Sequence, residues 1–149
     1  MKIEPYSREI TSEMMTLLLT ADPDESAIRS YLRESKVLVC VDEGRCIGIA
    51  LLMILNDQYE LKNIAVSDDH QGKGLAKLLI TEIRLLAKSL GAVRLEVGTG
   101  NSSLSQLALY QKCGFRMFEI IPGYFESYPE PIFENGIRCI DMVRLYAEI

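Results

Sequence analysis

A glycine-rich turn between a predicted strand and a predicted helix is the stretch of this chain best suited to bind an anion. The turn reads Gln71-Gly72-Lys73-Gly74. Its two glycines allow backbone conformations that other residues avoid, and they let a ligand approach without meeting a Cβ atom. The first amides of the following helix have no intrahelical acceptor and lie at the positive end of the helix dipole. The turn is therefore typical of a phosphate-binding site.

Spacing separates the phosphate-binding patterns that compete for this turn. A Walker A loop needs four residues between its first glycine and a Gly-Lys-Ser/Thr triplet, and residues 72–75 do not supply it. A dinucleotide fingerprint would need a third glycine where the chain has Lys77. The pattern that fits is Gln71-x-x-Gly74-x-Ala76 directly after a strand. The alternative is an ordinary strand-to-helix turn with a glycine at each tight point.

The elements on both sides must hold this turn in place. An apolar run through Ile64 and Val66 ends at a Ser-Asp-Asp turn, which predicts a strand over residues 59–66. Beyond the turn, leucines and isoleucines recur at three- and four-residue intervals. This spacing predicts an amphipathic helix that begins near Gly74 and stops at Gly91.

The rest of the chain predicts a mixed α/β protein. Its 149 residues, 48% hydrophobic and 25% charged, are typical of one soluble domain over residues 1–149. Further strands are expected over residues 2–6, 37–41, 46–55, 92–97, 115–121 and 137–145, and further helices over 14–19, 23–34 and 102–113. Residues 98–103 are expected to form a turn. The pattern contains no internal repeat and no linker.

Charge, hydropathy and cysteine usage exclude several classes. The net charge of −5 argues against nonspecific nucleic-acid binding and suits a cationic small substrate better. No apolar run approaches the ~20 residues of a membrane helix, and the start MKIEPYSREI lacks a signal-peptide core, so a cytoplasmic protein is expected. Four cysteines without CxxC spacing and a single histidine predict reduced thiols and no metal site.

Two segments in this order resemble the GNAT family of N-acetyltransferases. The segment NIAVSDDHQGKGLAKLL carries the family's Gln/Arg-x-x-Gly-x-Gly/Ala signature, and LALYQKCGF at residues 107–115 resembles its common ALYEKxGF segment. The resemblance covers most of residues 60–115. It implies the GNAT fold, a mixed central sheet of about seven strands flanked by about four helices with splayed fourth and fifth strands. It also implies acetyl-CoA as the acetyl donor.

The resemblance implies cofactor-binding roles on both sides of the glycine turn. In the family, the pantetheine arm lies between the splayed strands and the pyrophosphate lies on the glycine loop. The matching positions are Ile64, Ala65, Val66, Gln71, Gly72, Lys73, Gly74, Leu75 and Ala76. Lys73 and Lys77 lie about one helical turn apart and either neutralise phosphates or form a solvated basic face.

One position departs from the family pattern. The family often has an asparagine seven residues before the motif tyrosine, where this chain has Ser103. Asn101 stands two residues earlier. Either Asn101 reaches the cofactor through a longer loop or Ser103 replaces the asparagine, and the resemblance leaves both open.

The family match implies an acid and a base. Tyr110 would protonate the departing thiolate, a transfer between groups of ordinary pKa ~10 and ~8.5; the alternative is a tyrosine packed by its ring. Glu60 aligns with a family glutamate that deprotonates the incoming amine; otherwise it is a solvent-facing strand residue, and Glu96 is the reserve base. Cys113 lacks an activating base nearby in the sequence, so direct transfer in a ternary complex is expected over a thioester intermediate.

Residues 123–136, GYFESYPEPIFENG, combine four aromatic residues with three glutamates. They suit either a pocket for a cationic amine or a surface loop or dimer contact. We therefore expect an N-acetyltransferase for a primary amine of a small molecule or peptide, and a homodimer is possible within the family. The alternatives are a catalytically silent acyl-CoA sensor and an unrelated nucleotide-phosphate binder.

Overall fold

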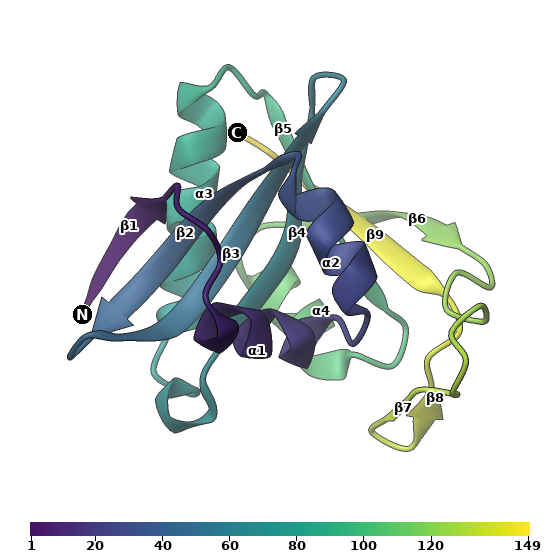
Figure 1. Ribbon diagram of the computed structural model, residues 1–149. Coiled ribbons are helices and arrows are strands. Elements are labelled where there is room, and N and C mark those ends of the chain that lie inside the picture. Colours follow the sequence, from purple (N-terminus) through teal and green to yellow (C-terminus); the bar gives the residue numbers. More distant parts are fainter. The chain divides into compact units, whose positions relative to one another are not determined.

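The computed structural model describes residues 1–149 (Figure 1). These residues divide into two units. The N-terminal unit comprises Met1–Leu95 together with Ile149, and the C-terminal unit comprises Glu96–Glu148. Each unit has its own strands and helices and is described by itself. The single domain expected over residues 1–149 stays a prediction.

Four antiparallel strands form the sheet of the N-terminal unit. They are β1 (Lys2–Tyr6), β2 (Ser35–Asp42), β3 (Arg45–Leu55) and β4 (Gln58–Val66), in the order β1-β2-β3-β4. Both hairpin turns have positive φ at their two central residues, 51° and 76° at Glu43-Gly44 and 52° and 62° at Asn56-Asp57. Turns of this kind match the twist of the flanking strands. The predicted hairpin over residues 37–55 is thus confirmed.

A bulge interrupts the pairing of β4 with β3. Asn63 is opposite Leu51, whereas Leu61 is opposite Leu52, so Lys62 is the extra residue. Below the bulge, Glu60 is opposite Met53. The bulge lies in the middle of β4, four residues before Val66, where the strand ends.

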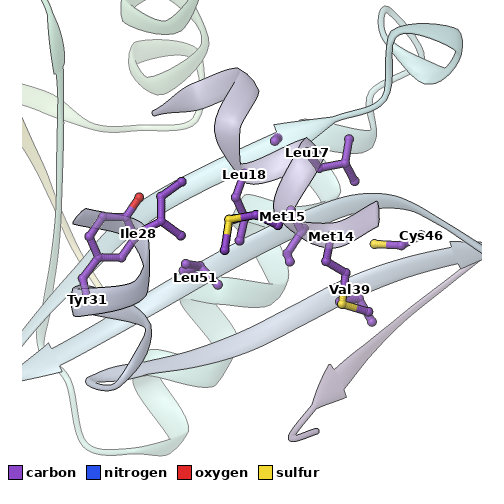
Figure 2. Packing of buried hydrophobic residues seen from close by; sticks show 11 residues of the cluster. Met14, Met15, Leu17, Leu18, Ile28, Tyr31, Val39, Cys46 and Leu51 are labelled. Carbon is purple, nitrogen blue, oxygen red and sulfur yellow. The ribbon is translucent and has the colours of Figure 1, made fainter. Parts of the chain in front are cut away.

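Helices cover the two faces of this sheet. Helices α1 (Ser12–Ala21) and α2 (Glu25–Leu32) begin at side-chain caps, because Thr11 accepts a bond from Met14 N and Asp24 from Ala27 N. Their apolar faces pack on β2, β3 and β4, as Figure 2 shows. The buried cluster consists of Met14, Met15, Leu17, Leu18, Ile28, Tyr31, Val39, Cys46, Ile49, Leu51 and Ala65.

Helix α3 (Leu75–Ser89) packs on the other face of the sheet. Leu75 and Leu79 contact the sheet where β3 has Gly48, since a Cβ atom on Gly48 would lie 3.3 Å and 3.1 Å from their side chains. A short 3₁₀ helix, Asp68–His70, connects β4 to the glycine turn. The predicted strand, turn and helix are therefore confirmed at this place.

The C-terminal unit contains a smaller sheet and one helix. Its elements are β5 (Arg94–Gly100), the first two residues of which are counted in the N-terminal unit, α4 (Leu104–Lys112), β6 (Arg116–Ile121), β7 (Phe133–Glu134), β8 (Ile137–Arg138) and β9 (Met142–Glu148). β9 lies between β5 and β6 and is antiparallel to β6. β7 and β8 form a separate hairpin.

Two sequence predictions in this unit were wrong. The glycines of residues 98–100 belong to β5 rather than to a turn, because their missing side chains leave room for neighbours: a Cβ on Gly98 would lie 2.7 Å from Met142 Sδ. The strand expected over residues 137–145 is split into β8 and β9. The split occurs because the side chain of Asn101, and not a strand partner, binds the amides of Ile140 and Asp141.

Candidate functional site

The glycine turn presents an open helix N-terminus. Gly72 and Gly74 have φ of 76° and 82°, and no atom lies within 4 Å of a Cβ built on either. Gly74 is the N-cap of α3, so no side chain bonds the first amides of the helix, and the first turn carries no acidic residue. The first intrahelical bond is from Leu78 N to Gly74 O, 3.1 Å long. The amides before it are thus available to an anion.

The side chain of Gln71 ties this turn to the strand. Its Nε2 donates to Val66 O at 3.1 Å and to Asp68 Oδ1 at 3.3 Å. The bonds span the 3₁₀ helix and fix where the turn begins. Lys73 and Lys77 follow, both exposed, so their ammonium groups are accessible to an anion on the turn.

The backbone at the end of β4 alternates in direction. Ser67 N donates to Ile47 O at 2.8 Å, so Ser67 and, two residues before it, Ala65 direct their amides toward β3. Ile64 and Val66 therefore direct their backbone groups toward the opposite edge of β4. This is the orientation that a ligand lying along that edge requires.

Tyr110 lies in α4, in the C-terminal unit, and is 4% exposed. Its ring packs against Phe115, with centroids 5.9 Å apart. Burial raises the pKa of the Tyr110 phenol far above its ordinary value, and the nearby Cys113 thiol raises it further. The phenol is therefore protonated at neutral pH, and it is a weaker acid than an exposed tyrosine.

Glu60 lies on β4 with a side chain that is 14% exposed. The Lys62 ammonium lies 3.8 Å from Glu60 Oε2 and 5.5 Å from the centroid of the Tyr31 ring. Glu60 is thus a partly buried, ion-paired carboxylate and not a plain solvent-facing residue. The reserve base Glu96 accepts a 2.9 Å bond from Arg144 Nη2.

A buried polar network next to Glu60 was not found from the sequence. Asn63 Nδ2 donates to Leu18 O at 3.2 Å and to Tyr31 Oη at 3.0 Å, and the Tyr31 hydroxyl donates to Asp22 Oδ2 at 3.1 Å. Asn63 Oδ1 is buried without a hydrogen-bond partner. The only available signal was an asparagine directly before the apolar residues 64–66 at the end of β4.

Asn101 and Ser103 lie between β5 and α4, and their side chains bind other parts of the C-terminal unit. Asn101 Oδ1 accepts from Ile140 N at 2.8 Å and Asp141 N at 3.0 Å, and its Nδ2 donates to Arg138 O at 3.1 Å. Ser103 Oγ donates to Glu134 Oε1 at 2.8 Å. The cofactor contact of either residue stays a prediction.

The structure brings part of the predicted site together. Ile64 to Ala76 and Glu60 share one strand, turn and helix start in the N-terminal unit, whereas Tyr110, Asn101 and Ser103 belong to the C-terminal unit. None of the four cysteines is in a disulfide. No group of three His, Cys, Asp or Glu side chains is arranged to hold a metal ion. None of the helices has the length and apolar character of a membrane span.

Comparison with known proteins identifies the family. A family model described as an acetyltransferase (GNAT) domain matches residues 33–117, more than half of the chain. The N-acetyltransferase YvbK of Bacillus subtilis, itself described as uncharacterized, is 43% identical over 143 residues, which cover 95% of this chain and 92% of YvbK.

Solved structures agree with this match. A GNAT family acetyltransferase from Elizabethkingia anophelis, solved with acetyl-CoA bound, has a TM-score of 0.94 at 39% identity and covers 99% of this chain and 97% of its own. An IAA acetyltransferase from Bacillus cereus has a TM-score of 0.93 at 46% identity and covers 99% of both chains.

The chain belongs to the GNAT acetyltransferase family. It has the GNAT fold, and the prediction of a mixed α/β fold with four α-helices is confirmed. The predicted enzyme class is confirmed too: the chain is an acetyl-CoA-dependent N-acetyltransferase.

Proposed function

We propose that this enzyme transfers the acetyl group of acetyl-CoA to a primary amine of a small molecule or peptide, by direct attack in a ternary complex. The observation that carries the proposal is the open N-terminus of α3, whose amides have neither a side-chain cap nor an acidic neighbour. A cytoplasmic location and a homodimer remain predictions within this proposal.

The cofactor roles follow from the geometry of the turn. The amides from Gly72 to Ala76 bind the pyrophosphate, because the positive end of α3 and the two glycines favour a closely approaching anion. The amide of Gln71, which the family match also implies, donates to Asp68 O at 3.4 Å. The backbone groups of Ile64 and Val66 bind the pantetheine arm, since they are directed away from β3. Lys73 adds positive charge beside the pyrophosphate.

Two side chains carry the proton transfers. Glu60 accepts the proton of the acceptor's ammonium, because an alkylammonium of pKa ~10.4 attacks no carbonyl until it is deprotonated. The neutral amine then forms a bond to the thioester carbonyl carbon, and its nitrogen loses a second proton to water. The carbon–sulfur bond breaks as the tetrahedral intermediate collapses to the neutral amide. Tyr110, whose phenol is protonated at neutral pH, donates its proton to the departing thiolate. The silent-sensor alternative is not favoured by the family match.

Calorimetric titration of acetyl-CoA into the full chain tests the cofactor site. A Gly74→Glu variant places bulk and negative charge on the glycine turn, where the pyrophosphate is proposed to bind. Gly44 in the β2–β3 turn is a matched control, because its φ of 76° is also positive and a Cβ there also meets no atom within 4 Å. We expect the parent and Gly44→Glu to bind acetyl-CoA and Gly74→Glu to bind none.

The outcome decides the next step. Binding by the parent and the control justifies a screen of primary amines with a thiol-release assay. Equal binding of acetyl-CoA by Gly74→Glu and Gly44→Glu would contradict the role of the glycine turn in cofactor binding. A parent that binds acetyl-CoA but releases no thiol with any amine would contradict the proposed acceptor class.

A further inference from the structure

The outward face of helix α3 carries leucines where a surface helix normally has polar residues. The inward face packs on the sheet of the N-terminal unit through Leu75 and Leu79 (Figure 1). On the outward face, Leu78 and Leu85 are 54% and 57% exposed and lie about two helical turns apart. Two leucines that are more than half exposed on one stripe of a helix indicate a contact with another molecule.

A hollow of about 370 Å³ lies beside the second of these leucines. The residues that line it are Thr81, Arg84, Leu85, Lys88 and Ile149. The amide of Ile149 donates a 3.0 Å bond to Val93 O, which holds this residue beside α3. The four helical residues stand at positions i, i+3, i+4 and i+7, the spacing of the hole that receives one side chain of a facing helix in coiled-coil packing. The hollow is therefore shaped for a side chain from a second helix.

A second copy of this chain supplies a side chain that fits. The centre of the hole lies next to Leu85 along the helix, so two α3 helices that cross antiparallel at this residue each place Leu85 in the hole of the other. The contact is symmetric, as the interface of a twofold dimer must be. In the same arrangement Leu78 lies opposite the end of the other α3, where Leu90 is 42% and Val93 77% exposed. The exposed apolar side chains of one copy thus meet those of the other.

The charges on this stripe are complementary in the antiparallel arrangement. Glu82 comes three residues before Leu85, and Lys88 comes three residues after it. An antiparallel pair centred on Leu85 therefore places Glu82 of each copy beside Lys88 of the other, whereas a parallel pair in register places like charges together. Within α3, neither charged residue has an opposite charge three or four positions away, the spacing of ion pairs inside a helix. Charge complementarity thus favours a second, antiparallel copy as the occupant of this face.

We propose that the outward face of α3 is the dimer interface of this enzyme, with two α3 helices packed antiparallel about a twofold axis at Leu85. The inference rests on the homodimer that the proposed function includes, and it does not depend on the transfer reaction. Leu85 lies ~16 Å along the helix from Gly74, so the glycine turn of each copy stays accessible to acetyl-CoA. A contact made by one helix face is small, so the dimer dissociates in the micromolar range.

Sedimentation velocity of the full chain tests this at protein concentrations from about 1 µM to about 300 µM. We expect the parent to shift from monomer to dimer over this range. Leu85→Glu brings two carboxylates together at the axis and should raise the dimer Kd at least about thirtyfold, the effect of losing a central contact. Leu55→Glu is the matched control, because Leu55 is 46% exposed but lies at the end of β3. It should dimerise like the parent.

Charge reversal tests the antiparallel arrangement. Glu82→Lys and Lys88→Glu should each raise the dimer Kd about fivefold or more, since each places like charges on both sides of the axis. The double variant restores opposite charges and should dimerise like the parent. Far-UV circular dichroism verifies that each variant is folded.

Three results would overturn the proposal. They are a parent that is monomeric at every concentration, a Leu85→Glu dimer as strong as that of the parent, and a double charge reversal that dimerises no better than the single variants. The sedimentation samples contain no acetyl-CoA, so a failure of the dimer face and a failure of the cofactor site or of the transfer reaction are distinguishable.

Discussion

The side-chain amide of Gln71 donates a 3.1 Å hydrogen bond to the carbonyl oxygen of Val66, so the first residue of the glycine turn is anchored to the last residue of β4. A second bond from the same nitrogen reaches Asp68 Oδ1. The turn is thereby organised by contacts within the chain. A loop that is already ordered loses less conformational entropy when it binds a ligand.

The Gln71→Ala variant should therefore bind acetyl-CoA more weakly. The variant loses both bonds, and the neutral bond to Val66 O alone, about 1 kcal/mol, corresponds to an increase in Kd of roughly fivefold. The thermal unfolding midpoint should move little, because Gln71 is exposed. Calorimetric titration with acetyl-CoA measures the first effect and differential scanning fluorimetry the second.

Gln71→Glu provides the matched comparison for this position. The glutamate keeps the length of the side chain, removes the donor and adds a negative charge beside Asp68 and the proposed pyrophosphate site. Its Kd should exceed that of Gln71→Ala. Equal affinity in the parent and both variants would show that the anchor does not shape the binding turn.

Tyr110→Phe should reduce the rate of acetyl transfer more than it weakens cofactor binding. The phenol is 4% exposed and protonated, and phenylalanine keeps its packing against Phe115 while removing the proton. Loss of a general acid costs roughly 10²-fold or more in kcat. Steady-state kinetics at saturating acetyl-CoA measure this, and a kcat within a factor of about two of the parent would contradict the acid role.

The same residue predicts a pH dependence of stability. Burial raises the pKa of folded Tyr110, whereas the unfolded tyrosine titrates near ~10. The contribution of the protonated Tyr110 phenol to the free energy of unfolding is therefore fully present below pH ~10. It is lost as the pH rises toward the folded pKa, by up to about 1.4 kcal/mol per pH unit. Urea unfolding from pH 8 to 11 should show a steeper alkaline loss for the parent than for Tyr110→Phe. Parallel curves would contradict the raised pKa.

The parts of the fold that depend on neighbouring residues were predictable from the sequence. The glycine turn is a local feature, because two positive-φ glycines and an uncapped helix start follow from residues 71–76 alone. The hairpin turns at Glu43-Gly44 and Asn56-Asp57 are local as well. Such features need no knowledge of where distant segments lie.

The parts that depend on distant residues were not predictable. Asn63 finds its partners on α1 and α2, 45 and 32 positions away, so its role appears only in the folded chain. Asn101 binds residues 37 to 40 positions later and thereby splits the strand expected over residues 137–145. Gly98 and Gly100 resemble turn residues in sequence, yet they serve close packing within β5.

Asn101→Ala should destabilise the protein by about 1–3 kcal/mol, because it leaves the amides of Ile140 and Asp141 without their acceptor. Asn101→Asp keeps an acceptor for both amides but loses the donor to Arg138 O, so its loss should be smaller. Urea unfolding measures both free energies. An alanine variant as stable as the parent would contradict the anchoring role.

The same variants resolve the cofactor prediction for this position. If Asn101 only anchors residues 138–141, then Asn101→Ala leaves the Kd for acetyl-CoA unchanged while the free energy of unfolding falls. A Kd that rises in Asn101→Ala and is unchanged in Ser103→Ala would instead assign the cofactor contact to the asparagine.

Gly100→Ala should be destabilising for a steric reason alone. Gly100 lies in β5 without positive φ, but a Cβ atom there would overlap Cys139 Sγ, a buried and free thiol. Overpacking of this kind costs about 1–3 kcal/mol. Cys139→Ala removes the obstructing sulfur, so the double variant should lose at least ~0.5 kcal/mol less than the sum of the single losses.

Gly98→Ala is the comparison variant. Its Cβ would lie 2.7 Å from the flexible thioether of Met142, which can move aside, so its loss of stability should be smaller. Additive losses for Gly100→Ala and Cys139→Ala in urea unfolding would show that the two residues do not limit each other's size.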